Sequence, residues 1–290
     1  MRPTLLMAVV VSMLQVAAIL LPATAEARVI YVDNRIGDDT NDGSLPQTLQ
    51  LRIGPVHSLR RAGLLVRPGD VIEIANTGIP YPGALRLIGG KASGVPSQPV
   101  YVNGNDAVFD GSELVEPASW ESLGGDLWRL DPLKKGWYQL VRGDVAVPEA
   151  PHAEADGRPL PPRGHWSVWQ GAIYYHAEPD EMPAFGAYRL ATHEAGIFIY
   201  GAHHIVVRNL TLRHYRLDGV NVHDLVYAAR LENVVAEANG RSGVFVGGSS
   251  EVILDGGALR DNRDAPLLIR EKAKVDVRDV DLDAEPVVAE

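Results

Sequence analysis

GIFI at Gly196, GVNV at Gly219, GVFV at Gly243 and PLLI at Pro266 form one pattern that recurs along the chain at offsets of 23, 24 and 23 residues. A second series keeps step with it at offsets of 24, 23 and 23: Asn209, Asn233, Gly256 and Asp279. A fixed period of this length is typical of a solenoid, in which each repeat packs on its neighbours.

Short runs of alternating apolar residues lie between the two series, as expected for strands with one buried face. The alternating pairs are Ile205 and Val207, Ala229 and Leu231, Val252 and Leu254, and Val275 and Val277. Each coil of the repeat therefore supplies one inward-facing row. The sequence predicts an all-β fold, a parallel β-helix, over residues 191–290.

The composition limits which folds, partners and metal sites the chain can have. The chain has 290 residues, 46% of them hydrophobic, with 29 glycines and 20 prolines, which suits a fold with frequent turns. The net charge of -10 argues against nucleic acid as a partner, because its phosphates are also negative. There are no cysteines, which excludes disulfides and thiolate metal sites.

Residues 1–27 have the features of an export signal. Arg2 precedes an apolar stretch from Leu5 to Leu21, and small residues follow up to Ala27. The alternative is an uncleaved membrane anchor, but Ser12 and the alanine-rich end favour cleavage. We therefore expect an exported protein, secreted or periplasmic, without a stable membrane anchor.

Residues 28–112 are expected to form the N-terminal cap and the first coils. They contain the strand RVIYVDN, the polar turn GDDTNDGS, the stretch VHSLRRAGLLV and the alternating strand VIEIA. Because the open end of a solenoid exposes its core, VHSLRRAGLLV is predicted to be a short capping helix.

Four segments carry a family resemblance: YVDNRIGDDTNDGS, RPGDVIEI, GGKASGVPSQPVYV and VFDGS. Their order resembles the N-terminal region of secreted right-handed parallel β-helix proteins of the pectate-lyase-like superfamily. Within it, the chain looks most similar to β-helix glycoside hydrolases and polysaccharide lyases. The resemblance covers most of the mature chain and implies a right-handed solenoid that acts on a polysaccharide.

Residues 113–190 interrupt the repeat and are predicted to be a β-rich insertion, as in the hydrolases that the chain resembles. All five tryptophans lie there, and WSVWQGAIYYHAEPD is predicted to form a hairpin. Trp166 and Trp169 are candidates for stacking on sugar rings. The alternative is that the tryptophans form the core of a small domain.

Candidate catalytic carboxylates come from the turns that precede the repeated glycines. One column of the alignment holds Glu194, Leu217, Arg241 and Asp264, and its neighbour holds Ala195, Asp218, Ser242 and Ala265. Glu194 and Asp218 are therefore expected in adjacent coils, at about the separation that a retaining glycosidase requires. The alternative is a solvated pair of turn residues without a function.

The same turns carry basic residues that are candidates for binding substrate: His214, Arg216, Arg241 and Arg263. With Asp264, and with His193 at the entry from the insertion, they would bind an acidic sugar, and Arg216, Arg241 or His214 would assist elimination in a lyase. The alternative is a ladder of surface ion pairs.

Two further sequence features are weaker signals for a metal site. GDDTNDGS looks like a calcium loop but lacks the distal glutamate, so no metal or other cofactor is expected. His203 and His204 are interpreted as strand-edge histidines, because no third ligand lies at metal spacing.

The sequence therefore favours glycoside hydrolysis of a polysaccharide by Glu194 and Asp218. It leaves open a polysaccharide lyase and a noncatalytic glycan-binding protein, and it does not identify the sugar or the oligomeric state.

Overall fold

The computed structural model describes residues 27–151, 154–155 and 157–289. The predicted signal segment, residues 1–27, lies outside this range except for its last residue. Within the described part of the chain, no helix is long and apolar enough to cross a membrane.

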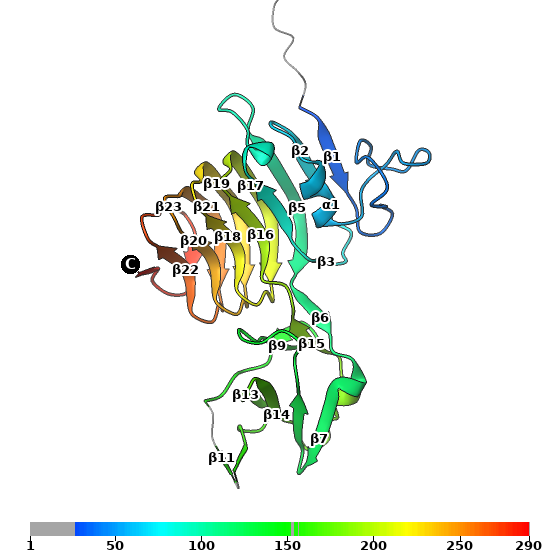
Figure 1. The fold of residues 1–290 in the computed structure, drawn as a ribbon, viewed down its shortest axis with the longest axis vertical. Coiled ribbons are helices and arrows are strands. Elements are labelled where there is room, and N and C mark those ends of the chain that lie inside the picture. The colour runs from blue at the N-terminus through cyan, green and yellow to red at the C-terminus, as the bar shows by residue number, and fades with distance from the viewer. Residues whose placement is uncertain (1–26, 152–153, 156, 290) are drawn as a thin grey trace, which may run out of the picture.

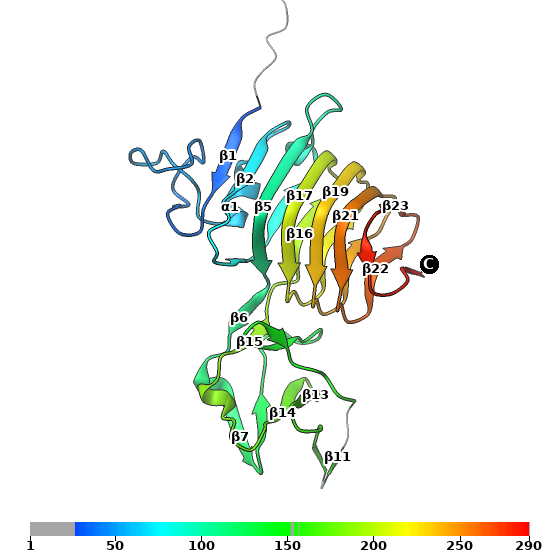
Figure 2. The same cartoon turned by 180° about the vertical axis from the view of Figure 1, so that it is seen from behind.

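Two parallel sheets form the body of the molecule, and from β16 to β23 successive strands along the chain alternate between them (Figures 1 and 2). The first sheet has the order β1 (Val29–Val32), β2 (Val71–Ile74), β5 (Val100–Asp110), β17 (His203–Arg213), β19 (Tyr227–Glu237), β21 (Glu251–Arg260) and β23 (Lys274–Arg278), with β3 (Tyr81–Pro82) beside β5 and β24 (Asp281–Leu282) beside β21. The second has the order β4 (Leu85–Ile88), β16 (Ala195–Tyr200), β18 (Asp218–His223), β20 (Ser242–Val246), β22 (Ala265–Arg270) and β25 (Val287–Ala289). The all-β class with parallel strands is confirmed, whereas the closed right-handed solenoid stays a prediction.

The register predicted for the repeat is confirmed. Ala195 pairs with Asp218, Asp218 with Ser242, and Ser242 with Ala265 in neighbouring parallel strands. Gly196, which follows Ala195, lies where the two sheets come close together. A Cβ added there would lie 2.5 Å from Leu212 Cδ2. The repeated glycine therefore marks a close approach between the two sheets.

The second series of the repeat marks a corner of each coil. Its members all have positive φ angles: 54° at Asn209, 49° at Asn233, 71° at Gly256 and 51° at Asp279. Asn, Gly and Asp tolerate this left-handed conformation better than other residues do. Asn233 Nδ2 also donates to Asn209 Oδ1 at 3.3 Å, so these side chains stack from one coil to the next.

A single apolar cluster runs between the sheets from Ile30 to Leu267. The predicted inward rows of β17, β19 and β21 are buried in it, and Val275 packs against it. Val277 was also predicted to face inward, but it is 38% exposed. The reason is that β23 is the last strand of its sheet, so no described strand lies beyond it.

The predicted N-terminal helix is confirmed as α1 (Leu59–Leu65), which packs against β1 and β4. Ser58 caps it by accepting a hydrogen bond from the backbone N–H of Arg61 at 3.1 Å. Leu59 and Ala62 are buried in the central cluster. Short 3-10 turns occur at Gly90–Ala92, Pro117–Ser119 and Pro183–Phe185.

The chain leaves the coils at β6 (Ser112–Leu114) and returns at β15 (Tyr188–Ala191), which pair antiparallel. The segment between them lies beyond the C-terminal ends of the first-sheet strands, to one side of the stack, in both views (Figures 1 and 2). Its strands are β9 (Leu140–Arg142) and β10 (Val145–Ala146) beside β15; β7 (Trp120–Gly124), β8 (Leu127–Leu130), β14 (Ala172–His176) and β13 (His165–Trp169) in a second sheet; and β11 (Glu154–Ala155) with β12 (Arg158–Pro159). The predicted hairpin is confirmed, because β13 pairs antiparallel with β14 across Gln170 and Gly171.

A carboxylate network ties this insertion together. Tyr175 and Arg142 each donate to Glu181 at 2.6 Å, and the hydroxyl of Tyr188 donates to it as well. Burial raises the pKa of Glu181, but the hydrogen bonds outweigh it and lower the pKa to about 2. Since the folded pKa is below the ordinary value of 4.5, the stabilisation is full above that value and is lost as the pH falls towards 2.

We expect Glu181→Gln to destabilise the insertion at pH 7 and to have progressively less effect as the pH falls from about 5 to 2. Tryptophan fluorescence measures this selectively, because all five tryptophans lie in the insertion. Glu121→Gln, which removes only an exposed ion pair with Arg129, is the control. Equal pH dependence in wild type and Glu181→Gln would contradict the assignment.

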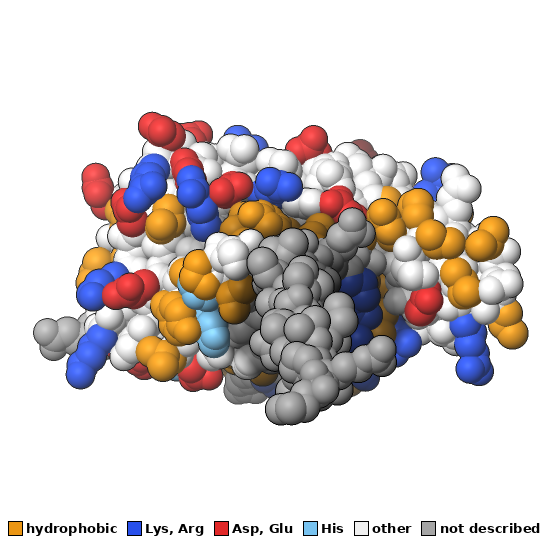
Figure 3. Space-filling view, turned by 90° about the horizontal axis from the view of Figure 1, so that it is seen from above, with side chains coloured by type: hydrophobic (Ala, Val, Ile, Leu, Met, Phe, Trp, Pro, Cys, Tyr) orange, Lys and Arg blue, Asp and Glu red, His pale blue; other side chains and the backbone are white. Residues whose placement is uncertain are grey.

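Figure 3 shows the face of the molecule opposite the insertion. Acidic and basic side chains are intermixed on the part of this face that grey atoms leave visible (Figure 3). The net charge of -10 is therefore not gathered into one patch on the visible surface.

Candidate functional site at the junction of coils and insertion

The turns that precede the second-sheet strands stack into a ladder, as predicted. The backbone N–H of Leu217 donates to Glu194 O at 2.9 Å, that of Arg241 to Leu217 O at 2.8 Å, and that of Asp264 to Arg241 O at 2.9 Å. We call these four residues the turn ladder. The strands that follow it start on the side of the molecule where the insertion lies (Figure 1).

Asp218 is fully buried beside this ladder, and polar side chains surround its carboxylate. Arg241 donates to both of its carboxylate oxygens, from Nε at 3.0 Å and from Nη2 at 2.6 Å. Ser242 Oγ donates at 2.7 Å and Asn221 Nδ2 at 2.6 Å. Four hydrogen bonds thus satisfy the carboxylate, and two of them come from a guanidinium in fork geometry.

Asn221 extends this network to an aromatic row on the outer face of the second sheet. The hydroxyl of Tyr200 donates to Asn221 Oδ1 at 2.9 Å, and the His223 ring stacks on Phe245 at 6.0 Å between centroids. Burial raises the pKa of Tyr200, and the negative charge of Asp218 raises it further. The hydroxyl therefore remains a donor at neutral pH.

Glu194, the other predicted carboxylate, has the opposite environment. Its side chain is exposed, and no hydrogen bond or ion pair to it is found among the described residues. Its charge also raises the pKa of Tyr200, which places it in the same electrostatic neighbourhood as Asp218. Of the predicted pair, only Glu194 is directly open to a ligand.

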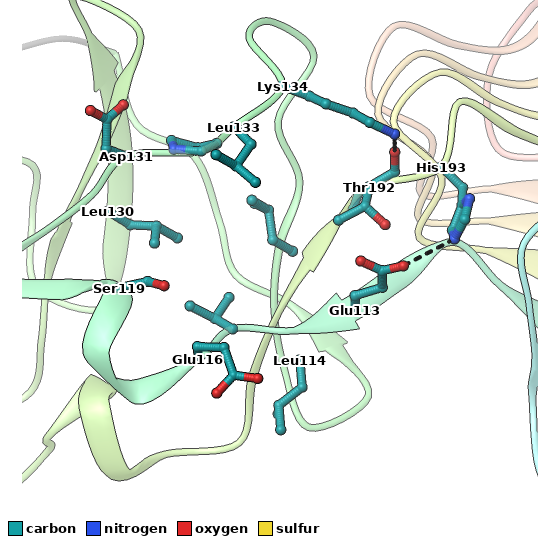
Figure 4. Close-up of a pocket in the computed structure, with 14 residues that line it drawn as sticks. Glu113, Leu114, Glu116, Ser119, Leu130, Asp131, Leu133, Lys134, Thr192 and His193 are labelled. Atoms are coloured by element: carbon teal, nitrogen blue, oxygen red, sulfur yellow. Dashed lines mark hydrogen bonds and ion pairs between the residues drawn. The ribbon is translucent and has the colours of Figure 1, made fainter.

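His193 opens onto a hollow of about 290 Å³ between β6, β15 and the start of the loop after β8 (Figure 4). Its Nε2 lies 3.3 Å from Glu113 Oε1 across the mouth. Lys134 closes another side by donating to the carbonyl of Thr192 at 2.8 Å. The remaining lining residues are mostly apolar: Leu114, Val115, Leu130, Pro132, Leu133, Leu190 and Ala191.

Two of the predicted basic residues are buried and engaged in internal contacts. His214 Nδ1 lies 3.1 Å from Asp110 Oδ2. Burial raises the pKa of Asp110, but the hydrogen bonds from His214 and Ser112 outweigh it and hold the pKa well below its usual range. Arg216 donates to the backbone carbonyls of Lys135 and Gly136, in the insertion.

Arg241 and Arg263 are also paired with carboxylates, so the predicted row of cations takes the form of an ion-pair ladder. Arg263 Nη2 lies 2.6 Å from Glu149 Oε2, beside a hollow of about 510 Å³ that Trp166 and Asp261 also line. Burial raises the pKa of Glu149, Asp264 adds to this, and Arg263 opposes it. Glu149 was not predicted, because the insertion that carries it has no repeat from which its position follows.

Most of the tryptophans are packed, as the core alternative predicts. Trp166 is only 1% exposed and donates to the carbonyl of Val147 at 2.8 Å. It therefore has no free ring face for the predicted sugar contact. Trp169 is half-buried, with its ring at 6.0 Å from that of Tyr174.

The weaker signals have local structural explanations. Asp38, Asp39 and Asp42 of GDDTNDGS all accept hydrogen bonds from backbone N–H groups, as in Asx-rich turns. His203 stacks on Tyr227 with 4.5 Å between centroids, at the start of β17.

No protein-family model matches the sequence, and no curated protein matches it either. Two of the solved structures that match have TM-scores above 0.5. A glycoside hydrolase has a TM-score of 0.61 and 13% identity, over 84% of this chain and 67% of that one. The complex of XylC with xylose has a TM-score of 0.58 and 12% identity, over 90% of this chain. This chain spans 60% of the XylC chain, and at such identities the similarity is one of fold.

Proposed function

We propose that the chain is an exported carbohydrate-active protein, a right-handed parallel β-helix of the pectate-lyase-like superfamily, that hydrolyses a glycosidic bond in a polysaccharide. The observation that carries this proposal is the contrast between two acids one coil apart, Glu194 exposed and Asp218 buried against Arg241. Glycoside hydrolysis needs two carboxylates in different environments. The fold relatives support the substrate class, since one is a glycoside hydrolase and the other is bound to xylose.

In this proposal Glu194 is the acid that touches the glycosidic oxygen. A water molecule adds to the anomeric carbon as the glycosidic bond breaks, and it returns its proton to Glu194. Asp218 is fully buried and paired with Arg241, so it does not touch the sugar and acts through the residues that it positions. Asp218 also orients Asn221, whose Oδ1 accepts a hydrogen bond from the Tyr200 hydroxyl. The sugar chain would lie along the turn ladder, with the insertion as its other wall.

We expect Glu194→Gln to lower the release of reducing ends by about 10²- to 10⁴-fold. Its stability should remain that of wild type, because the side chain is exposed. The measurement is a reducing-end assay on neutral and uronate polysaccharides, xylan among them, with Glu285→Gln as an exposed-acid control outside the turn ladder. Undiminished release by Glu194→Gln would exclude this residue as the acid.

The two alternatives predict other products. A lyase gives an unsaturated product with new ultraviolet absorbance, but Arg216, Arg241 and His214, its candidate bases, are already engaged with internal acceptors. A noncatalytic glycan-binding protein releases nothing. The second alternative is favoured by the complete hydrogen bonding of Asp218, and saccharide binding without any product would establish it.

A further inference from the structure

We propose that Trp137 is a platform on which a sugar ring stacks at the junction of coils and insertion. This inference rests on the proposed function and adds to it a recognition residue and a ligand class, a pyranose with an apolar C–H face. Aromatic rings suit such faces because they are flat, apolar and rigid.

The exposure of Trp137 separates it from the other tryptophans. It is 46% exposed, whereas Trp120 and Trp166 are buried and Trp128 and Trp169 pack against the clusters of the insertion. An exposed indole loses the contribution that burial makes to stability. Its ring therefore remains available to a ligand.

The backbone presents this ring in an unfavourable conformation. Trp137 has a φ angle of 54°, and Gly136 before it has 78°. A left-handed conformation is unfavourable for a bulky L-residue. Such conformations persist where surrounding contacts impose them, and they gather at functional sites.

The contacts that impose it come from the turns of the coils. The guanidinium of Arg216, itself 8% exposed, donates to the carbonyls of Lys135 at 2.9 Å and Gly136 at 2.7 Å. Lys134 donates to the carbonyl of Thr192, and the hydroxyl of Tyr138 donates to the carbonyl of Gly171 at 2.9 Å. Residues 134–138 are thus held on both sides, and the backbone that carries Trp137 is preorganised for binding.

The same contacts place the segment that carries Trp137 beside the proposed chemistry. Arg216 directly precedes Leu217 of the turn ladder, and its backbone N–H donates to His193 O at 2.8 Å. The segment that carries Trp137 therefore meets the coils at the level of His193 and Glu194. An aromatic face with nearby acids, bases and carbonyls is the usual composition of a saccharide site.

The test is a binding titration of wild type, Trp137→Phe and Trp137→Ala with xylo-oligosaccharides and uronate oligosaccharides, followed by calorimetry. We expect Trp137→Ala to raise Kd about tenfold and Trp137→Phe to keep most of the affinity. Phe185→Ala removes another exposed aromatic ring of the insertion and should leave Kd unchanged. Far-ultraviolet circular dichroism should show the same fold in all variants.

Arg216→Met tests the positioning contacts separately. We expect it to raise Kd, because the segment loses its attachment, while saturating saccharide restores the wild-type turnover. Arg216→Lys should recover part of the affinity, since an ammonium can still donate to one of the two carbonyls.

Each outcome decides something. If wild type binds saccharide and Trp137→Ala binds equally well, the platform is overturned and the proposed function stands. If no saccharide of either class binds to wild type, the proposed function fails and the platform fails with it. If Phe185→Ala weakens binding as much as Trp137→Ala does, the effect belongs to the insertion as a whole and the assignment of Trp137 is wrong.

Discussion

Asp218→Ala is expected to lower the free energy of unfolding by about 3–5 kcal/mol, the range found when one partner of a buried ion pair is removed. The substitution leaves the Arg241 guanidinium without its carboxylate. It also removes the acceptor of Ser242 Oγ and Asn221 Nδ2. Desolvated donors without acceptors are the main source of the loss.

Urea denaturation followed by circular dichroism measures this effect. Glu194→Gln is the matched control, because it changes an exposed acid in the adjacent coil and should shift stability by less than about 0.5 kcal/mol. The double variant Asp218→Ala/Arg241→Met should be less destabilised than the sum of the two single variants, since it leaves no unpaired charge. A loss below about 1 kcal/mol for Asp218→Ala would contradict the burial and pairing described here.

Gly257→Ala is expected to lower the free energy of unfolding by about 3 kcal/mol or more, from two causes that add. The φ angle of 88° is unfavourable for any residue with a Cβ. In addition, the new Cβ would lie 2.1 Å from the backbone oxygen of Val234. Val234 pairs with Gly257 in the parallel ladder of β19 and β21, so the backbone cannot yield without breaking that pairing.

Gly201→Ala separates the two causes. Gly201 has a φ angle of 56°, but an added Cβ there meets no atom within 4 Å. We therefore expect this variant to lose only about 1–2 kcal/mol, the cost of the backbone conformation alone. Equal losses for both substitutions in urea denaturation would show that the collision at Val234 contributes nothing.

The pairing of the parallel strands was predictable because the sequence pattern repeats. Each coil spans nearly the same number of residues, so the offsets of 23 and 24 fixed which residues become neighbours. Ala195, Asp218, Ser242 and Ala265 accordingly pair in the predicted order.

The chemistry of the candidate site was predictable only in part. The alignment placed Glu194 and Asp218 in adjacent coils. It did not indicate that Arg241 and Asn221 would donate hydrogen bonds to the Asp218 carboxylate. Whether a turn residue faces solvent or a neighbouring side chain depends on the local chain direction. The period alone does not specify that direction.

The insertion was predictable only in outline. Its tryptophan content indicated a small β-domain, and the hairpin followed from WSVWQGAIYYHAEPD. The sequence did not distinguish the buried Trp166 from the exposed Trp137, because both lie in short polar-aromatic runs. It also did not indicate Glu149, which meets Arg263 more than one hundred positions away in the chain.

By itself, the sequence determined the all-β class and the parallel register of the repeat, because these depend on local spacing. Only the tertiary structure decided which carboxylate is free, which tryptophan is exposed and where the insertion meets the turns. Those properties arise from contacts between segments that share no period, such as Arg216 with Gly136. Such contacts depend on how the insertion folds back onto the coils, and no spacing within either segment encodes that.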